Sequence, residues 1–435
     1  MRPGPALLLL LLAWTALGVA VGTGQVPLSV WLAFGAACLV IALLDAWLLS
    51  RLPSPVVTRE LPPVVPLVPE WKVGLRVHAA GARVQVVDLH DLHPGEWPVR
   101  GMPRRLRLEP RREVNLDYAV SPGGRGQFQF PGCQIRLRSP LRGWTQQRIV
   151  GHPSVLRVYP NFAPLAEMAG LSVEVASRSV GARLQRRRGD GTEFQELREY
   201  RIGDSLRKID WKATARMGRP ISREYRDERN QQVILLLDGG RRMLAQDDRL
   251  SHFDHVLNAS LALAYIALRQ GDAVGMLSCS GQDMRWLPPQ QGNGGMDMLL
   301  GAGYDLQAQP VATDYVGAAS ALQLHQRRRA FVVLITNVRD EDDEELRMAV
   351  SLLSRRHLVL VVSLRETALD ESIGMLDESV ESAVRSASVM HYLAQRQAMH
   401  DKLQREGVAV LDVTCGELSG RLIERYLAAK RDGRL

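Results

Sequence analysis

The residues best placed to do chemistry lie in the loop 238–243 (DGGRRM), which opens with Asp238 directly after an apolar run at 233–237. Ligands of parallel sheets bind beyond the carboxyl ends of the strands, so a site is expected in a loop of this kind. The loop is neither a dinucleotide-binding glycine fingerprint nor a phosphate-binding loop that ends in Lys and Ser or Thr. Nucleotide binding of these two kinds is therefore not expected here.

A second candidate is the pair His252 and His255, which lie one helical turn apart with Asp254 between them. Two imidazoles at this spacing could begin a metal site, but the sequence identifies no third ligand, and surface histidines are the plainer interpretation. The chain also has no Gly-x-Ser-x-Gly nucleophile elbow and no His-Glu-x-x-His helix. We therefore expect a protein that is not an enzyme and that needs no cofactor.

Both candidates depend on a C-terminal segment, 231–435, in which apolar runs alternate with amphipathic patterns. Continuous apolar strands between helices predict an α/β domain with a doubly wound parallel sheet covered on both faces. The expected strands are 233–237, 273–278, 331–336, 358–364 and 408–413, and the expected helices are 253–269, 315–326, 344–355, 380–405 and 418–430.

The preceding stretch, 193–230, is dense in charge but carries apolar side chains at spacings that allow burial. Asp204 or Ser205 is expected to cap the start of a short helix, because their side chains can accept hydrogen bonds from unpaired backbone N–H groups. Gly218 is expected to end that helix before a strand at 221–225.

Within the short helix, residues three or four positions apart share a face. Trp211 is expected to anchor the helix to the sheet domain, and its replacement by alanine would then destabilise the fold by about 3–5 kcal/mol. Lys208 and Lys212 would point elsewhere, toward the acidic surface of a partner. A structural plug with solvated charges is the alternative interpretation of this stretch.

The stretch resembles the DUF58 family, a set of bacterial membrane-associated proteins of poorly defined role. The matching motifs form an ordered series at 193–194, 197–200, 203–204, 207–212 and 223–225. Family members resemble companions of MoxR-type AAA+ ATPases, which implies an adaptor that acts in the maturation or assembly of other protein complexes. The residues expected to bind the partner are Arg198, Tyr200, Gly203, Asp204, Arg207, Lys208, Asp210, Trp211, Lys212, Glu224 and Tyr225.

The loop 238–243 resembles the metal-site loop of von Willebrand factor A domains, which has the pattern Asp-x-Ser-x-Ser. Asp238 matches, but Gly240 and Arg242 stand at the serine positions, and Asn337 stands at a later acidic position. The resemblance implies a von Willebrand factor A-like fold whose metal site is degenerate. We expect Arg241 or Arg242 to take the place of the ion. The alternative is a metal-dependent ligand-binding receptor or enzyme that uses this loop or the His252/His255 pair.

Two apolar stretches near the N-terminus, 6–21 and 26–49, predict a transmembrane hairpin. The turn between them contains no Lys or Arg, whereas Arg2 precedes the first stretch and Arg51 follows the second. The positive-inside bias then places both ends, and everything after them, in the cytoplasm. The first stretch could instead be a cleaved signal peptide. Asp45, near the inner end of the second stretch, is expected to reach the membrane interface.

Short alternating runs separated by turn residues predict a β-sandwich-like domain between the hairpin and the motif block. An arginine-rich run at 183–191 and a net charge of +8 could suit nucleic acid, but the run lacks interleaved aromatic residues, so we do not expect a nucleic-acid partner. The four cysteines show no CxxC pair, which fits a reducing compartment.

These patterns predict a membrane-anchored, non-enzymatic adaptor at the bacterial inner membrane, with its soluble domains on the cytoplasmic side. Its expected partners are a MoxR-type AAA+ ATPase and a client complex. The predicted parts are a transmembrane hairpin (1–52), a β-rich sandwich-like domain (53–165), a basic linker (166–192), the motif block (193–230) and a von Willebrand factor A-like α/β domain (231–435).

Overall fold

The computed structural model describes residues 1–82, 84–161, 193–201, 206, 209–226, 230–281, 283–339, 343–374, 380–433 and 435. The chain divides into two compact units, Met1–Tyr159 and Pro160–Leu435. The whole of the predicted basic linker, 166–192, lies outside the described residues.

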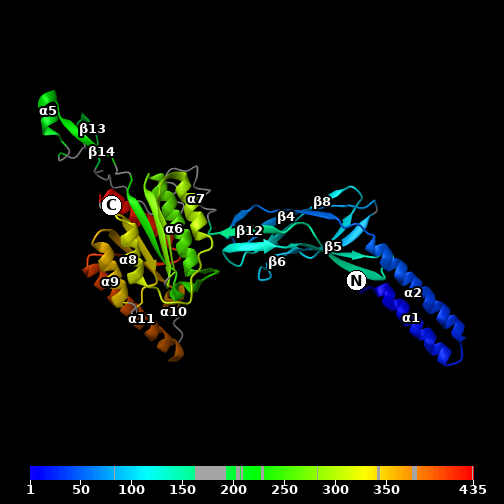
Figure 1. Ribbon diagram of the computed structural model, residues 1–435. Helices are drawn as coiled ribbons and strands as arrows, with labels where there is room; N and C mark the ends of the chain where they lie inside the picture. Colours follow the sequence, from blue (N-terminus) through cyan, green and yellow to red (C-terminus); the bar gives the residue numbers. More distant parts are fainter. Residues whose placement is uncertain are drawn as a thin grey trace. The chain divides into compact units, whose positions relative to one another are not determined.

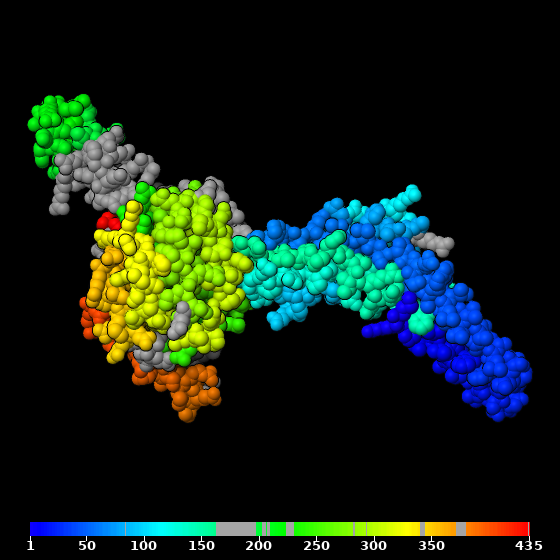
Figure 2. Space-filling view, in the orientation of Figure 1, coloured from blue at the N-terminus to red at the C-terminus, as the bar shows by residue number. Residues whose placement is uncertain are grey.

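The first unit begins with two apolar helices, α1 (Pro5–Gly22) and α2 (Leu28–Ser50), which are joined by a short turn (Figure 1). Both are long and apolar enough to cross a membrane, with mean hydropathies of 2.1 and 2.3. They lie against each other, as the dark-blue helices in Figure 2 show. A helical hairpin of this composition is consistent with a membrane anchor.

A reciprocal tryptophan contact holds the two helices together. Trp14 and Trp31 stack with their ring centroids 4.9 Å apart, and each indole N–H donates a hydrogen bond to the backbone carbonyl of the other residue. Glycine makes room for each ring, since a Cβ at Gly35 would lie 2.6 Å from Trp14 Nε1 and one at Gly18 would lie 3.0 Å from Trp31 Nε1. Small residues of this kind allow helices to approach closely in a membrane.

Asp45 of α2 fixes the hairpin to the strands of the same unit. Its carboxylate is 1% exposed and accepts hydrogen bonds from Ser139 Oγ (2.6 Å), Leu141 N (3.0 Å) and Gly143 N (3.0 Å). The position of Asp45 relative to the membrane interface stays a prediction, but its carboxylate is buried against the turn between two strands. This turn covers the carboxylate and donates hydrogen bonds that replace those the carboxylate would make to water.

The strands of the first unit form three sheets, with the orders β1-β11-β10-β5-β7, β3-β12-β9 and β2-β4-β8-β6. Every described pairing is antiparallel except that of β3 with β12, which is parallel. This agrees with the antiparallel β-rich domain expected from the alternating pattern, whose stacking as a sandwich stays a prediction. The strands are β1 (Arg2–Pro3), β2 (Val56–Glu60), β3 (Val64–Pro66), β4 (Trp71–His78), β5 (Gln85–Leu92), β6 (Val99–Arg100), β7 (Arg104–Leu108), β8 (Glu113–Val120), β9 (Gly126–Phe130), β10 (Gly132–Arg138), β11 (Trp144–Val150) and β12 (Ser154–Tyr159).

The second unit is built around a six-stranded sheet with the order β19-β18-β15-β20-β21-β22. Its first strand in the chain, β15 (Gln232–Asp238), alternates strictly. Leu235 and Leu237 pack into one apolar cluster with α6 (His252–Arg269) and α12 (Leu418–Arg431). Ile234 and Leu236 pack into another with α8 (Tyr315–His325), α9 (Asp343–Ser354) and α11 (Val380–Arg405). Helices therefore cover both faces of the sheet, as Figure 1 shows and as the continuous apolar strands predicted.

The sheet is mixed, which corrects the expectation of an all-parallel sheet. The edge strand β19 (Asp283–Gln290) pairs antiparallel with β18. The sequence pattern did not predict β19 because Pro288 and Pro289 argue against a strand: proline has no N–H to donate within a sheet. The structure accommodates both prolines because β19 is an edge strand. The other five strands and the main helices lie within a few residues of their expected positions.

The remaining elements of the second unit are as follows. The strands are β13 (Glu193–Glu199), β14 (Ile221–Arg226), β15 (Gln232–Asp238), β16 (Gln246–Asp247), β17 (Leu250–Ser251), β18 (Ala273–Ser280), β20 (Phe331–Thr336), β21 (Leu358–Arg365) and β22 (Ala409–Thr414). The helices are α5 (Trp211–Met217), α6 (His252–Arg269), α7 (Gly292–Gly303), α8 (Tyr315–His325), α9 (Asp343–Ser354), α10 (Thr367–Gly374), α11 (Val380–Arg405) and α12 (Leu418–Arg431), with a 3-10 turn η2 at Arg241–Leu244.

Candidate functional site

Asp238 ends β15 at the carboxyl edge of the six-stranded sheet, where the sequence predicted a site. Its side chain is 1% exposed. One carboxylate oxygen accepts hydrogen bonds from Gly240 N (2.8 Å) and from the hydroxyl of Thr313. The other accepts from Tyr315 Oη (2.9 Å) and Thr336 Oγ1 (2.6 Å). Four neutral donors thus serve both oxygens of a buried carboxylate, so its hydrogen bonding does not depend on Arg241 or Arg242.

The positions expected to form a degenerate metal site are closed by the chain itself. A Cβ at Gly240 would lie 2.1 Å from Thr313 Oγ1, so a serine could not stand there unless the threonine moved. Arg242 is 9% exposed and its Nη1 lies 3.4 Å from the backbone oxygen of Asn337. The replacement of an ion by Arg241 or Arg242 stays a prediction, whereas the structure shows that the Thr313 hydroxyl fills the space beside Gly240 and donates to Asp238.

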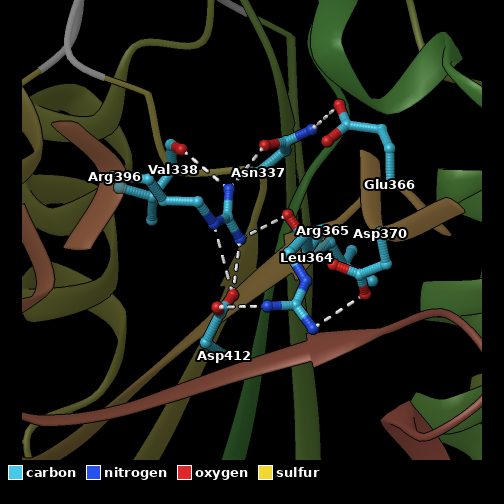
Figure 3. A network of polar contacts seen from close by, with 8 residues as sticks. All are labelled: Asn337, Val338, Leu364, Arg365, Glu366, Asp370, Arg396 and Asp412. Carbon is cyan, nitrogen blue, oxygen red and sulfur yellow. Dashed lines mark hydrogen bonds and ion pairs between the residues drawn. The ribbon is translucent and has the colours of Figure 1, made fainter. Parts of the chain in front are cut away.

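A buried arginine joins the carboxyl ends of three neighbouring strands (Figure 3). Arg396 of α11 is 2% exposed, and its guanidinium donates to Asn337 Oδ1 (3.0 Å), Val338 O (2.9 Å) and Leu364 O. It also forms an ion pair with Asp412 at 2.8 Å. The guanidinium N–H groups of Arg396 all point at acceptors of this chain, as Figure 3 shows. Arg396 is thus an internal cation that links β20, β21 and β22.

The network continues from Asn337 to Glu366, which follows β21. Asn337 Nδ2 donates to Glu366 Oε1 at 2.8 Å, and Arg339 lies 3.2 Å from the same oxygen. Burial alone would raise the pKa of Glu366, but hydrogen bonds from its own backbone and from Asn337 lower that pKa overall. Glu366 is therefore a carboxylate at neutral pH, partly buried and held beside Asn337.

The two members of the predicted pair, His252 and His255, have different surroundings in the structure. His252, the first residue of α6, is 0% exposed, whereas His255 Nε2 lies 3.3 Å from the backbone oxygen of Asp247. Burial lowers the pKa of His252, against the opposite effect of the negative charges of Glu366 and Asp247. Burial raises the pKa of the nearby Cys415 thiol to about 12, and the charge of Asp247 acts in the same direction.

The motif block forms an antiparallel pair, β13 with β14, and the short helix α5 between them. Asp210 caps α5 by accepting hydrogen bonds from Lys212 N and Ala213 N, both at 3.0 Å, and Gly218 ends it with a positive φ of 66°. The end at Gly218 is confirmed. The expected caps, Asp204 and Ser205, lie outside the described residues.

The burial predicted for Trp211 is wrong. Its side chain is 71% exposed, and no residue of α5 is buried. Trp211 stands at the first position of a helix of seven residues, which is too short to offer a core-facing stripe of two turns. Lys212 and Arg216 are exposed on the same helix, one turn apart.

The other predicted partner-binding residues are placed only in part. Arg198 and Tyr200 lie at the end of β13, where Tyr200 N donates to Pro220 O at 2.9 Å. In the backbone register, Glu224 of β14 pairs with Glu196, and Tyr225 pairs with Phe194. The predicted site residues outside the described part of the chain are Gly203, Asp204, Arg207 and Lys208.

Several residues of this edge carried no signal in the sequence. Thr313 and Tyr315 precede and begin α8, and Arg396 lies within a polar helix, so neither spacing nor composition links them to Asp238 or Asn337. Asp247 and Cys415 likewise approach His252 only because the topology brings the ends of distant strands to one edge. The general rule that ligands bind at carboxyl ends of strands predicted the edge, but not its members.

Comparison with known proteins finds a family model that matches part of the chain. Residues 196–404 match the family model described as protein of unknown function DUF58. An uncharacterized protein of Mycobacterium tuberculosis is 26% identical over 262 residues, which cover 57% of this chain and 82% of the relative. The uncharacterized protein YeaD of Bacillus subtilis is 20% identical over 183 residues, which cover 42% of this chain and 43% of the relative.

Solved structures resemble the chain only weakly. Proximal thread matrix protein 1 from the mussel byssus aligns over 46% of this chain and 46% of its own, with 12% identity and a TM-score of 0.28. A Salmonella alpha-2-macroglobulin mutant aligns over 24% of this chain and 7% of its own, with 15% identity and a TM-score of 0.19. These similarities are too low to support a statement about the fold or the function of the chain.

Proposed function

We propose that this protein, whose residues 196–404 match the DUF58 family model, is a membrane-anchored, non-enzymatic adaptor that works with a MoxR-type AAA+ ATPase. In this proposal the adaptor supports the maturation or assembly of other protein complexes. The hairpin of α1 and α2 holds it at the bacterial inner membrane, and its soluble units lie on the cytoplasmic side, where ATP is available to the partner.

The observation that carries the proposal is the exposed aromatic and basic surface of α5. Trp211 is 71% exposed and Met217 is 60% exposed. Tryptophan is enriched at the centres of protein interfaces, because its large ring buries much area at a small cost in conformational entropy. Lys212 and Arg216 lie one turn apart beside it, and the first turn of α5 has no acidic residue. This surface suits an acidic partner with an apolar pocket.

The carboxyl edge of the sheet supports a role without catalysis. The Asp238 carboxylate has four donors of its own, and the Arg396 guanidinium is fully engaged with carbonyl, amide and carboxylate oxygens. Groups that are fixed in this way stabilise the edge of the sheet and are not poised to transfer a proton. In our proposal the fold is a von Willebrand factor A-like domain whose ion site has been replaced by hydrogen bonds within the chain.

The experiment is co-purification of the cognate ATPase with variants of α5. Lys212→Glu combined with Arg216→Glu should abolish recruitment, because each reversal places like charges against an acidic surface. Trp211→Ala should weaken recruitment at least tenfold, since truncation of an interface tryptophan costs about 2 kcal/mol or more. Neither change should lower the melting temperature appreciably, because the three side chains are exposed.

A matched control reverses two exposed arginines elsewhere in the same unit. Arg327→Glu combined with Arg328→Glu changes the net charge by the same amount, so it should leave recruitment intact. Loss of binding in both double variants would indicate a general electrostatic effect. Full binding by a folded Lys212→Glu and Arg216→Glu variant would contradict the assignment of the interface to α5.

A further inference from the structure

A cluster of three potential metal ligands lies at the carboxyl edge of the sheet, apart from the Asp238 loop. Asp247 ends β16, His252 is the first residue of α6, and Cys415 directly follows β22. One ligand atom from each residue lies within 4.8 Å of the other two. His252 and Cys415 are buried, at 0% and 6% exposure, so their approach is not a chance contact of flexible surface side chains.

His252 is the observation that points to a ligand. Both of its ring nitrogens are buried, and neither has a hydrogen-bond partner among the described residues. A buried imidazole loses the hydrogen bonds it makes to water, and this cost is normally offset by a partner within the protein. Glu366 Oε2 is a second buried atom without such a partner in the described part of the chain, and its charge acts on both His252 and Cys415.

We propose that Asp247, His252 and Cys415 bind one transition-metal ion of the zinc class. Sulfur, imidazole nitrogen and carboxylate oxygen together are typical of zinc, whereas magnesium and calcium prefer sites built only from oxygen. Zinc bonds of about 2.0–2.3 Å would hold the ligand atoms roughly 3.5 Å apart, so a cluster within 4.8 Å needs an inward shift of about an ångström. Cys415 binds as the thiolate, and its proton is released to solvent.

Neighbouring groups already orient the cluster. Thr367 Oγ1 donates to Asp247 Oδ2 at 2.9 Å, and His255 contacts the Asp247 backbone oxygen at 3.3 Å. Such outer contacts fix the direction of a ligand and are typical of metal sites. His255 is therefore a support for Asp247 and not the second ligand that the sequence spacing suggested. Three protein donors leave one tetrahedral position open, and Glu366 Oε2 is available to accept a hydrogen bond from a ligand there.

The ion would link segments that are distant in the sequence. It would join the β16–β17 hairpin and the start of α6 to the turn between β22 and α12. Because the unfolded chain does not hold these three side chains together, binding energy would appear as stability of the fold. This site goes beyond the adaptor role and does not depend on it, since it shares no residue with α5.

The test uses the full chain in detergent, stripped of metal with a chelator and titrated with cobalt. The wild-type protein should bind one equivalent, with a thiolate-to-cobalt charge-transfer band in the ultraviolet and the visible bands of a tetrahedral ion. Zinc should displace the cobalt and raise the melting temperature. Cys415→Ser should remove the charge-transfer band, and His252→Ala should weaken cobalt binding at least tenfold.

Two controls separate this site from other thiols and from the histidine pair. Cys279→Ser changes another buried cysteine of the same unit and should keep the full cobalt spectrum. His255→Ala removes a support of Asp247 and not a ligand, so it should weaken cobalt binding less than His252→Ala does and should keep the charge-transfer band. If Cys415→Ser does not fold, Asp247→Asn provides the second variant, with circular dichroism to check folding. A wild-type chain without a charge-transfer band, or a band that survives in folded Cys415→Ser, would overturn the proposal.

Discussion

Asp238 keeps a buried carboxylate because neutral donors from three elements surround it. The sequence correctly placed this residue at the end of a strand, and it identified His252 as a candidate ligand. It did not identify Thr313, Tyr315 or Cys415, because no spacing relates them to their partners. Side chains that are distant in the sequence and meet only in the folded chain leave no local sequence pattern. These contacts could therefore be found only from the structure.

The first prediction at this scale concerns hard cations. Magnesium or manganese should leave the melting temperature unchanged, because four donors occupy the Asp238 oxygens and Gly240 supplies no ligand. Thermal unfolding with and without each ion measures this. The comparison variant is Asp238→Asn. A stabilisation by magnesium that is present in the wild type and lost in Asp238→Asn would contradict the closed loop, since an ion that binds only the folded state must raise its stability.

A second prediction at the residue scale concerns His357, which precedes β21. It is 4% exposed, and neither ring nitrogen has a partner among the described residues. Burial, with a smaller effect of Arg356, lowers its pKa below the ordinary value of about 6.5. The folded chain then binds fewer protons than the unfolded chain at this site. The stability that His357 contributes is present above about pH 6.5 and is lost as pH falls from there through the folded pKa.

His357→Gln should therefore show a smaller fall in melting temperature between about pH 7.5 and about pH 5.5 than the wild type. Each protein is compared with its own value at the higher pH, so a general loss of stability in the variant does not affect the comparison. An unchanged slope would show that His357 does not take part in the pH dependence.

At the scale of elements, periodicity predicted most of the second unit. Continuous apolar runs located five strands, and amphipathic patterns located the helices between them. Two of the departures from the prediction, at β19 and α5, have a clear physical reason. The strand β19 was not predicted because its prolines argue against a strand. The helix α5 was predicted to have a buried face, but none of its seven residues is buried. In both cases tertiary context decided against the local pattern.

The prediction for this scale concerns the contact between α2 and the strands of the first unit. Asp45→Ala should speed hydrogen exchange at the backbone amides of Leu141 and Gly143, which donate to the carboxylate. A hydrogen bond to a charged group contributes about 1.5–3 kcal/mol, so exchange should rise about tenfold or more. Asp45→Asn keeps an acceptor oxygen and should show a smaller increase. Unchanged exchange in Asp45→Ala would show that the turn is held by other contacts.

For the whole molecule, the two apolar helices matter because most of their large apolar side chains have no protein surface to pack against. In the most apolar 18-residue stretch of each helix, 0% of the residues of α1 and 11% of those of α2 are buried. Such surface is unfavourable in water and favourable in lipid. The sequence predicted this hairpin from composition alone, but it could not predict the docking of Asp45, which depends on a turn far along the chain.

The prediction at this scale is the topology. A reporter fused after Leu435 should be active in the cytoplasm and silent in the periplasm, because arginines flank the hairpin and its turn has none. A paired set of cytoplasmic and periplasmic reporters, fused at the same residue, provides the measurement. Activity of the periplasmic reporter would contradict the proposed location and remove access to a cytoplasmic ATPase.

The measurement that tests the adaptor role most directly is site-specific photocrosslinking in native membranes. A photoreactive amino acid in place of Trp211 should crosslink to an AAA+ ATPase, because this side chain lies exposed at the proposed interface. The same group in place of Leu324, which is 77% exposed at the end of α8, should not. The account predicts an ATPase adduct at position 211 alone. No ATPase adduct at that position, or an equal one from position 324, would contradict it.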